Sequence, residues 1–304
     1  MRITFVMLTT TLAGGMRYIF EVANRLESRG YSVKILSLLD DHGWFKGLNV
    51  EVIYKRPRYY NKADVAIFKL YKLYSLFKYG IDKARNIRPY EAFVSISRWM
   101  GVRPDFIYDL AELIQEFDQD VIIAASYQAA LSAWLSSSPI RRLYLMQDFP
   151  ELVEGDGAIG VKMFYLSLKL LAEFVAVSGY TKQIILEQNP TAKVTIAHPG
   201  VDHNVFRPRR GVVDVGGKKK IMVILRGLRH KGDEVAIRVL NEVSRRIPLH
   251  AILVGSKELV SKYSKSLGFN FSYSLFSGVD DDTLAKLYSS ADAFLYTSYA
   301  EGFG

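Results

Sequence analysis

Short apolar runs alternate with stretches of helical apolar spacing along most of the chain. In the first two thirds, strand-like apolar runs occupy residues 3–8, 31–38, 50–54, 121–125, 142–146 and 174–177. Between the first two of these runs, residues 16–29 place apolar side chains at helical spacing and end at Gly30. Short buried strands that alternate with helices are typical of a parallel sheet covered on both faces. The pattern therefore predicts an α/β fold.

A second series with the same rhythm follows a stretch that contains proline and glycine, residues 198–217. It comprises predicted strands at 220–225, 250–254, 273–276 and 293–296 and predicted helices at 233–246, 258–267 and 280–290. A chain of 304 residues is long enough for two domains. We therefore expect one domain over residues 1–205 and a second over residues 206–304. Open parallel sheets bind their ligands at the carboxyl ends of the strands.

The composition excludes some classes of protein without naming a function. Hydrophobic residues make up 49% of the chain and charged residues 23%, which is ordinary for a globular protein. There is no cysteine, so disulfides and thiolate metal sites are excluded. The first apolar run is too short for a secretion signal, and Lys162, Lys169 and Glu173 interrupt the longest apolar stretch. We therefore expect a cytoplasmic protein without a membrane span.

The positive charge is concentrated in one segment, residues 55–103. Twelve lysines and arginines there accompany only three acidic residues, which accounts for the whole net charge of +9, and ten aromatic residues lie among them. Within it, residues 65–77 are mostly apolar but carry Lys69 and Lys72 three positions apart. This pattern predicts either a helix that lies on an anionic membrane surface or a core helix with a basic solvated face. A nucleic-acid-binding module is a further alternative, although no recognised nucleic-acid motif is present.

Two cations flank a predicted turn at the start of the second domain. The strand at 220–225 delivers Arg226, a turn at Gly227 follows, and Lys231 is expected to open the next helix. A helix N-terminus adds a positive dipole and free backbone N–H groups. Arg226 and Lys231 would together grip a diphosphate and stabilise the charge that grows on it as it leaves. The alternative is a pair of solvated surface cations beside a glycine turn.

The C-terminal residues carry a family likeness. The runs 275–279, 284–293 and 296–304 closely resemble the nucleotide-sugar half of family 4 glycosyltransferases. The resemblance implies the GT-B fold, in which two Rossmann-like domains face a cleft and the first binds the acceptor. It also implies transfer of a sugar from a nucleoside-diphosphate sugar to an acceptor hydroxyl, with retention at the anomeric carbon. A nucleotide-sugar 2-epimerase of the same fold is an alternative that needs no acceptor.

The resemblance also assigns roles to individual residues of the second domain. In the family, a Glu-Gly-Phe-Gly sequence opens a motif with two glutamates, and the first glutamate meets the donor sugar. Here Glu301 takes that position, and the residues expected to approach the donor with it are Val279, Gly302, Phe303 and Gly304. The second glutamate would lie eight residues after Glu301, beyond the last residue. We therefore expect an incomplete second domain, from either a fragment of a longer protein or a non-catalytic remnant.

In the first domain, the likeness covers two further positions. Gly14 and Gly15 follow the first strand, like the family's glycine-rich loop, and they form either a site for phosphate and acceptor or a plain turn. Many members have a histidine after the strand that corresponds to 142–146, where this chain has Gln147 and Asp148. Asp148 would either orient a substrate hydroxyl or cap the turn after it. This Gln-Asp variant resembles members that act on polysaccharide chains, which favours cell-surface polysaccharide or glycolipid synthesis.

We expect no metal and no cofactor besides the donor substrate. Asp280, Asp281 and Asp282 resemble an acidic metal motif, but they precede a predicted helix, where aspartates cap the first turn. Arg226 and Lys231 would supply the charge neutralisation that a metal supplies elsewhere. The expected partners are a nucleotide sugar, a sugar or lipid-linked acceptor and an anionic surface at the inner face of the membrane, without nucleic acid.

Overall fold

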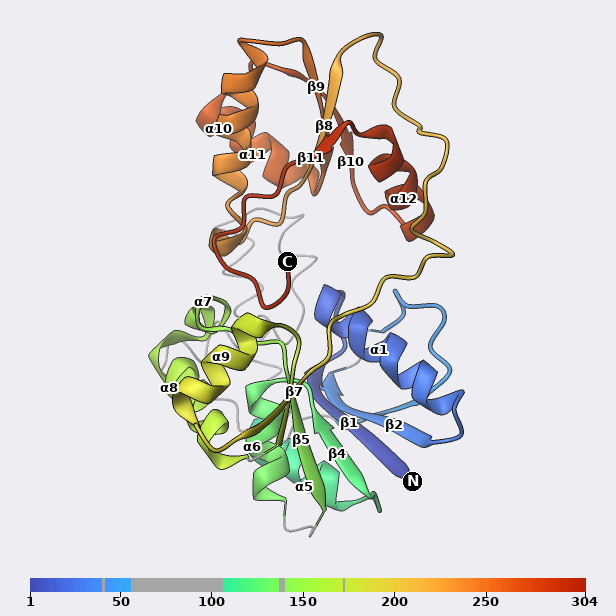
Figure 1. Ribbon diagram of the computed structural model, residues 1–304, viewed down its shortest axis with the longest axis vertical. Helices are drawn as coiled ribbons and strands as arrows, with labels where there is room; N and C mark the ends of the chain where they lie inside the picture. Colours follow the sequence, from blue (N-terminus) through green and yellow to red (C-terminus); the bar gives the residue numbers. More distant parts are fainter. Residues whose placement is uncertain (40–41, 56–105, 137–139, 172) are drawn as a thin grey trace, which may run out of the picture. The chain divides into compact units, whose positions relative to one another are not determined.

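The computed structural model describes residues 1–39, 42–55, 106–136, 140–171 and 173–304. The chain forms two structural units, Met1–Pro199 and Gly200–Gly302, with Phe303 grouped with the first and Gly304 with the second (Figure 1). The division lies between Pro199 and Gly200. The domain boundary expected after residue 205 stays a prediction.

In the described residues, the first unit is built on a sheet of seven parallel strands in the order β3-β2-β1-β4-β5-β6-β7. The strands are β1 (Arg2–Thr9), β2 (Ser32–Leu39), β3 (Glu51–Tyr54), β4 (Val121–Ala124), β5 (Arg141–Met146), β6 (Glu173–Ala176) and β7 (Lys193–Ile196). All six predicted strands are present, which confirms the parallel α/β fold. The additional strand, β7, lies at an edge and is largely exposed, so it carries no continuous apolar run.

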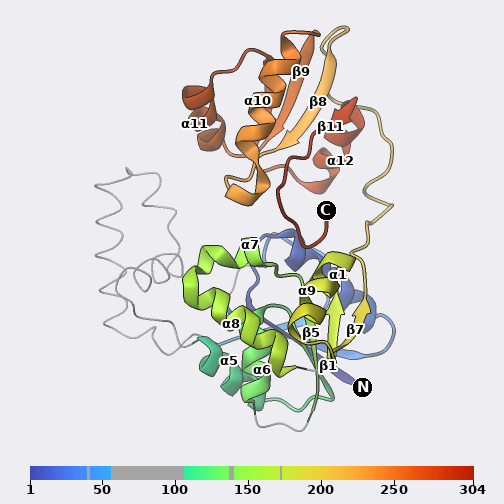
Figure 2. The ribbon, with the colours of Figure 1, turned by 60° about the vertical axis from the view of Figure 1, so that its left-hand side comes forward.

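Helices bury both faces of this sheet. They are α1 (Gly14–Glu27), α5 (Phe106–Gln115), α6 (Tyr127–Leu135), α7 (Pro150–Val153), α8 (Gly157–Leu170) and α9 (Gly179–Gln188), with a short 3-10 turn at Glu154–Asp156. Ile3, Phe5 and Met7 of β1 pack against α1, and Val6 between them is equally buried. Neighbouring side chains of a strand point to opposite faces. The other face is covered by α5 and α6, which contact β1 and each other (Figure 2).

The second unit has four parallel strands in the order β10-β9-β8-β11. The strands are β8 (Lys219–Ile224), β9 (Leu249–Val254), β10 (Ser272–Phe276) and β11 (Ala293–Phe294), and the helices are α10 (Asp233–Ser244), α11 (Lys257–Leu267) and α12 (Asp281–Ser290). Val223 of β8 packs in the apolar cluster of α10 and α11. The preceding Met222 packs with Leu287 of α12. This sheet is therefore also covered on both faces.

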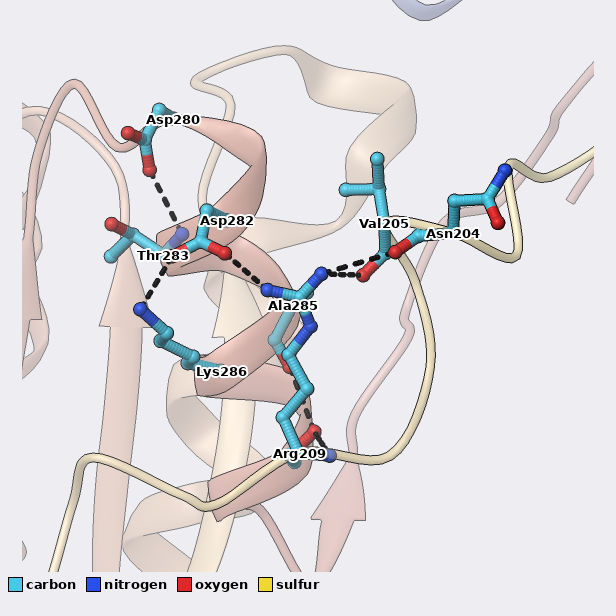
Figure 3. Close-up of polar contacts among 9 residues, drawn as sticks. Asn204, Val205, Arg209, Asp280, Asp282, Thr283, Ala285 and Lys286 are labelled. Atoms are coloured by element: carbon cyan, nitrogen blue, oxygen red, sulfur yellow. Dashed lines mark hydrogen bonds and ion pairs between the residues drawn. The ribbon is translucent and has the colours of Figure 1, made fainter.

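The segment that leads into β8 is fastened to α12 by Arg209 (Figure 3). The guanidinium pairs with Asp282 at the start of α12 and donates from Nη2 to the carbonyl oxygen of Val205 at 2.7 Å. The Arg209 backbone N–H donates to Ser289 Oγ at 3.1 Å, near the other end of the helix. One arginine thus attaches the incoming chain to both ends of α12.

Candidate functional site

In the second unit, the turn after β8 is organised by a buried acid. Asp233, the first residue of α10, accepts the backbone N–H groups of Arg226 at 2.9 Å and Gly227 at 2.7 Å through its Oδ2. Asp233 is 4% exposed, and Tyr263 donates to the same oxygen. The two N–H groups are therefore used inside the protein and are not available to a ligand.

Lys231 does not open the helix, as the sequence suggests, but lies in a 3-10 turn just before it. The turn spans Arg229–Lys231, and α10 begins at Asp233. Between them Gly232 has a φ of +65°, in the left-handed region that favours glycine. This residue interrupts the helical path, so the Lys231 side chain leaves the chain from the turn and not from the first turn of α10.

A distant segment is bonded to this 3-10 turn. The N–H of Tyr299 donates to the carbonyl oxygen of His230 at 2.7 Å, and Thr297 Oγ1 donates to that of Gly232 at 2.9 Å. A Cβ atom on Gly232 would lie 2.1 Å from the Thr297 carbonyl oxygen, a separation that no side chain tolerates. Gly232 is therefore required both for its backbone conformation and for the close approach of the C-terminal segment.

This docking brings together two of the predicted site residues, Lys231 and Glu301. The ammonium lies 2.6 Å from Oε1 and 2.8 Å from Oε2 of the carboxylate. The side chains are 25% and 15% exposed, respectively. Burial acts to raise the pKa of Glu301, but hydrogen bonds from Lys231, Tyr296 and Ser298 outweigh it and hold that pKa below its ordinary value. Glu301 is therefore an ionised acceptor, held from three directions.

Tyr296 is a member of this group that the sequence reasoning missed. Burial and its hydrogen bond to Glu301 raise the pKa of Tyr296 to about 12, so the phenol stays protonated and donates. The backbone of Gly304 lies beside the Tyr296 ring, at 3.5 Å when measured from an ideal Cβ position. Tyr296 and Ser298 follow a short strand and belong to no recognisable motif. Only their closeness to Glu301 in the sequence could have identified them as members of the site.

The other residues predicted to bind the donor substrate have different surroundings. Arg226 is exposed, and among the described residues its guanidinium makes no ion pair; its charge is near enough to Tyr288 to act on the pKa of that phenol. Val279 follows β10 and packs against the apolar cluster around Leu287, so its side chain has a structural role. Gly302 is buried and Phe303 is 45% exposed.

In the first unit, Gly14 and Gly15 form the first turn of α1 and not a loop before it. The N-cap residue of this helix, Ala13, makes no side-chain capping hydrogen bond. A Cβ atom on Gly15 would lie 2.6 Å from Gln147 Oε1, so the absence of a side chain lets Gln147 approach the helix. Within the described part of the chain, the buried Nε2 atom of Gln147 has no hydrogen-bond partner.

Asp148 follows β5 and is built into the framework of the first unit. Its Oδ2 accepts the backbone N–H of Tyr127, the first residue of α6, at 2.8 Å and the hydroxyl of Tyr144 at 2.6 Å. Burial raises the pKa of Asp148 from its ordinary 3.8 to about 6, although both hydrogen bonds act to lower it. Asp148 therefore binds the first N–H group of α6, while Ser126 caps that helix by accepting the N–H of Ala129. The substrate contact that the sequence suggested for Asp148 stays a prediction.

The three aspartates at 280–282 have individual structural roles. Asp280 caps α12 by accepting the N–H of Thr283 at 2.8 Å, which confirms the capping interpretation (Figure 3). Asp282 pairs with Arg209 and, at 2.5 Å, with Lys286. The described residues contain no group of three or more histidine, cysteine, aspartate or glutamate side chains placed to hold a metal ion.

The basic aromatic segment lies outside the described residues, apart from Lys55. Lys55 forms ion pairs with Glu112 and Glu116 of the region around α5. No helix in the part of the chain that the structure describes is both long and apolar enough to cross a bilayer. The predicted contact of this segment with an anionic membrane surface stays a prediction.

Comparison with protein families matches nearly the whole chain. Residues 12–205 match Glycosyltransferase Family 4, and residues 208–304 match Glycosyl transferases group 1. A search of curated proteins found no match. The two matches meet close to the predicted domain boundary after residue 205.

Solved glycosyltransferase structures share the fold at low sequence identity. Anabaena Alr3699/HepE, crystallised with UDP and glucose, superposes with a TM-score of 0.69 at 14% identity over 100% of this chain and 76% of that chain. Sucrose-phosphate synthase from Thermosynechococcus elongatus gives 0.64 at 14% identity over 100% and 77%. WaaG, a glycosyltransferase of lipopolysaccharide biosynthesis, gives 0.62 at 14% over 99% and 76%. These likenesses confirm the predicted GT-B fold with two Rossmann-like sheets.

Proposed function

The chain belongs to Glycosyltransferase Family 4, and on that premise we propose that it moves a sugar from a nucleoside-diphosphate sugar to an acceptor hydroxyl with retention at the anomeric carbon. The observation that carries the proposal is the placement of Lys231 beside Glu301, which are 70 residues apart in the sequence. In a nucleotide sugar the diphosphate and the sugar are adjacent. A site for it therefore needs a cation for the diphosphate next to a carboxylate that accepts hydrogen bonds from the sugar hydroxyls.

In this proposal Arg226 and Lys231 bind the diphosphate and stabilise its charge as the bond to the sugar breaks. Glu301 accepts hydrogen bonds from hydroxyls of the donor sugar, and the chain around Gly302 and Gly304 lies close to the ligand. Arg226 and Lys231 neutralise the charge of the diphosphate, so the reaction needs no metal. Structures of similar fold were solved with UDP in HepE and with ADP in starch synthase IV of Arabidopsis thaliana, which supports a nucleotide-sugar donor.

For the acceptor, we propose a growing cell-surface polysaccharide or glycolipid. Two proteins of similar fold, WaaG and the galactosyltransferase WaaB, act in lipopolysaccharide synthesis, which supports this class of acceptor. The cations and aromatic residues of 55–103 favour an anionic membrane surface where a lipid-linked acceptor would lie. The chain should then sediment with vesicles that contain phosphatidylglycerol and stay in solution with pure phosphatidylcholine vesicles.

Titration calorimetry with UDP, ADP, GDP and dTDP tests the donor site. We expect one nucleotide to bind, and we expect Arg226→Ala to weaken that binding by about tenfold or more, because it removes a charged phosphate contact. Arg238→Ala is the matched control, because Arg238 is an exposed arginine on α10. Binding of no nucleotide, or equal losses in both variants, would contradict the proposal.

Product analysis separates transfer from the alternative reaction of this fold. With the matching nucleotide sugar alone, we expect no 2-epimer, and with an acceptor we expect a glycoside. The anomeric configuration of that glycoside, measured by NMR, tests retention. Accumulation of the 2-epimer without any acceptor would identify an epimerase instead.

A further inference from the structure

The Lys231–Glu301 ion pair is complete before any ligand arrives. Both carboxylate oxygens contact the ammonium, at 2.6 and 2.8 Å. The pair has no net charge, so the field of Lys231 is largely cancelled for an approaching anion. Among the described residues Arg226 makes no ion pair, and it is exposed, so the charge of its guanidinium is not cancelled in this way.

We infer that this ion pair lets the site distinguish a nucleotide that carries a sugar from one that has lost it. The inference rests on the proposed function. A diphosphate that binds Lys231 must take the ammonium from Glu301. With a nucleotide sugar, sugar hydroxyls replace the hydrogen bonds that Glu301 gives up. With the nucleoside diphosphate alone, no group of the ligand replaces them.

The cost of an unpaired Glu301 follows from its surroundings. The carboxylate is 15% exposed, so water can compensate only partly for the loss of the ammonium. Tyr296 and Ser298 remain as hydrogen-bond donors, but neither carries a charge. The diphosphate would also bring its own negative charge close to the carboxylate. The leaving product is therefore held more weakly than Arg226 and Lys231 alone would hold it, which favours its release after transfer.

The position of the pair is set by the backbone and not by the pair itself. Tyr299 N–H bonds to the His230 carbonyl, and Thr297 bonds to that of Gly232. These bonds keep Lys231 and Glu301 adjacent whether or not their side chains touch. Binding therefore requires only side-chain movement, and removal of the Glu301 charge should leave the site assembled.

The test is a comparison of affinities in Glu301→Gln, measured by calorimetry on the whole chain. We expect this variant to bind the nucleoside diphosphate about fivefold or more tightly than the unmodified chain, because Lys231 no longer has a carboxylate partner. The same variant should bind the nucleotide sugar more weakly, because an amide replaces the charged acceptor of the sugar hydroxyls. A purely structural role for Glu301 would weaken both ligands.

Two controls make the result specific. Glu242→Gln removes a carboxylate from the surface of α10, where it pairs with Arg245 and Arg246, and should change neither affinity. In a Lys231→Met background, Glu301→Gln should no longer improve binding of the diphosphate, because there is no ammonium to release. Thermal unfolding of each variant shows that the second unit is still folded.

The outcomes separate this inference from the function on which it rests. If the unmodified chain binds no nucleotide, the proposed donor site fails and the inference fails with it. If it binds nucleotide but Glu301→Gln weakens or does not change the affinity for the diphosphate, the inference alone is overturned. It is also overturned if the gain persists in the Lys231→Met background.

Discussion

The two units each place a carboxylate beyond the carboxyl end of a parallel strand, and they treat it in opposite ways. Asp148 of the first unit accepts a backbone N–H and a phenol, and burial raises its pKa to about 6. Glu301 of the second unit is bound to an ammonium, and its pKa is lowered. Equivalent topology therefore does not give equivalent surroundings: the neighbours decide whether the pKa of a carboxyl is raised by burial, as in Asp148, or lowered by a cation and hydrogen bonds, as in Glu301.

The largest expected effect comes from breaking the contact that positions Glu301. Gly232→Ala adds a Cβ atom 2.1 Å from the Thr297 carbonyl at a φ of +65°, so we expect the second unit to lose about 3 kcal/mol or more. Urea unfolding measures the loss. Gly216→Ala is the control, because Gly216 lies in a turn of the same unit with a φ of +52° but open space around it, and it should cost only about 1 kcal/mol. Equal losses would show that the close approach of the Thr297 segment does not matter.

The next effect concerns the carboxylate of the first unit. Asp148→Ala leaves the buried Tyr144 hydroxyl and the Tyr127 N–H without their acceptor, and should cost about 2–3 kcal/mol relative to Asp148→Asn, which keeps an acceptor oxygen. The asparagine is also neutral at every pH. If it proved as destabilising as alanine in urea unfolding, the hydrogen bonds of Asp148 would not be its contribution to the fold.

The raised pKa of Asp148 predicts how this comparison depends on pH. The native state binds the proton more tightly than the unfolded state, so the stability of the chain falls as the pH rises from about 4 to about 6 and is level above that. Asp148→Asn removes this cost, so at pH 8 it should be more stable than the unmodified chain by about 1–2 kcal/mol, with little difference near pH 4. If Asp148→Asn were less stable than the unmodified chain at pH 8, the predicted direction of the pH dependence would be wrong.

The smallest effect is expected at a third, more exposed carboxylate. Asp282 pairs with Arg209 and Lys286 but is 53% exposed, so water already screens its charge. Asp282→Asn should change the free energy of unfolding by less than about 1 kcal/mol. A loss as large as that of Asp148→Ala would show that the attachment of the incoming chain to α12 depends on the charge of Asp282. It would also show that solvent exposure does not predict how much a carboxylate contributes to the free energy of unfolding.

Most of the fold could be predicted from local patterns, because buried parallel strands are continuous apolar runs and the helices between them have apolar faces. β7 was missed because an exposed edge strand has no such run. Lys231 was expected at a helix start because its neighbours in sequence suit one, but the helix begins later, after Gly232 turns the chain into the left-handed region. The sequence shows that Gly232 marks a turn. It does not show that the turn contacts Thr297, which lies 65 residues away.

The α/β architecture, the order of the two units and the chemical types of the candidate site residues can all be predicted from the sequence, since they follow from apolar periodicity and from the family likeness around Glu301. Which of these residues meet is a property of the folded chain. Folding pairs Lys231 with Glu301 and adds Tyr296 to them, and it binds Asp148 to α6. Hydrogen bonds and desolvation depend on distances between atoms far apart in the chain, and local sequence does not encode these distances.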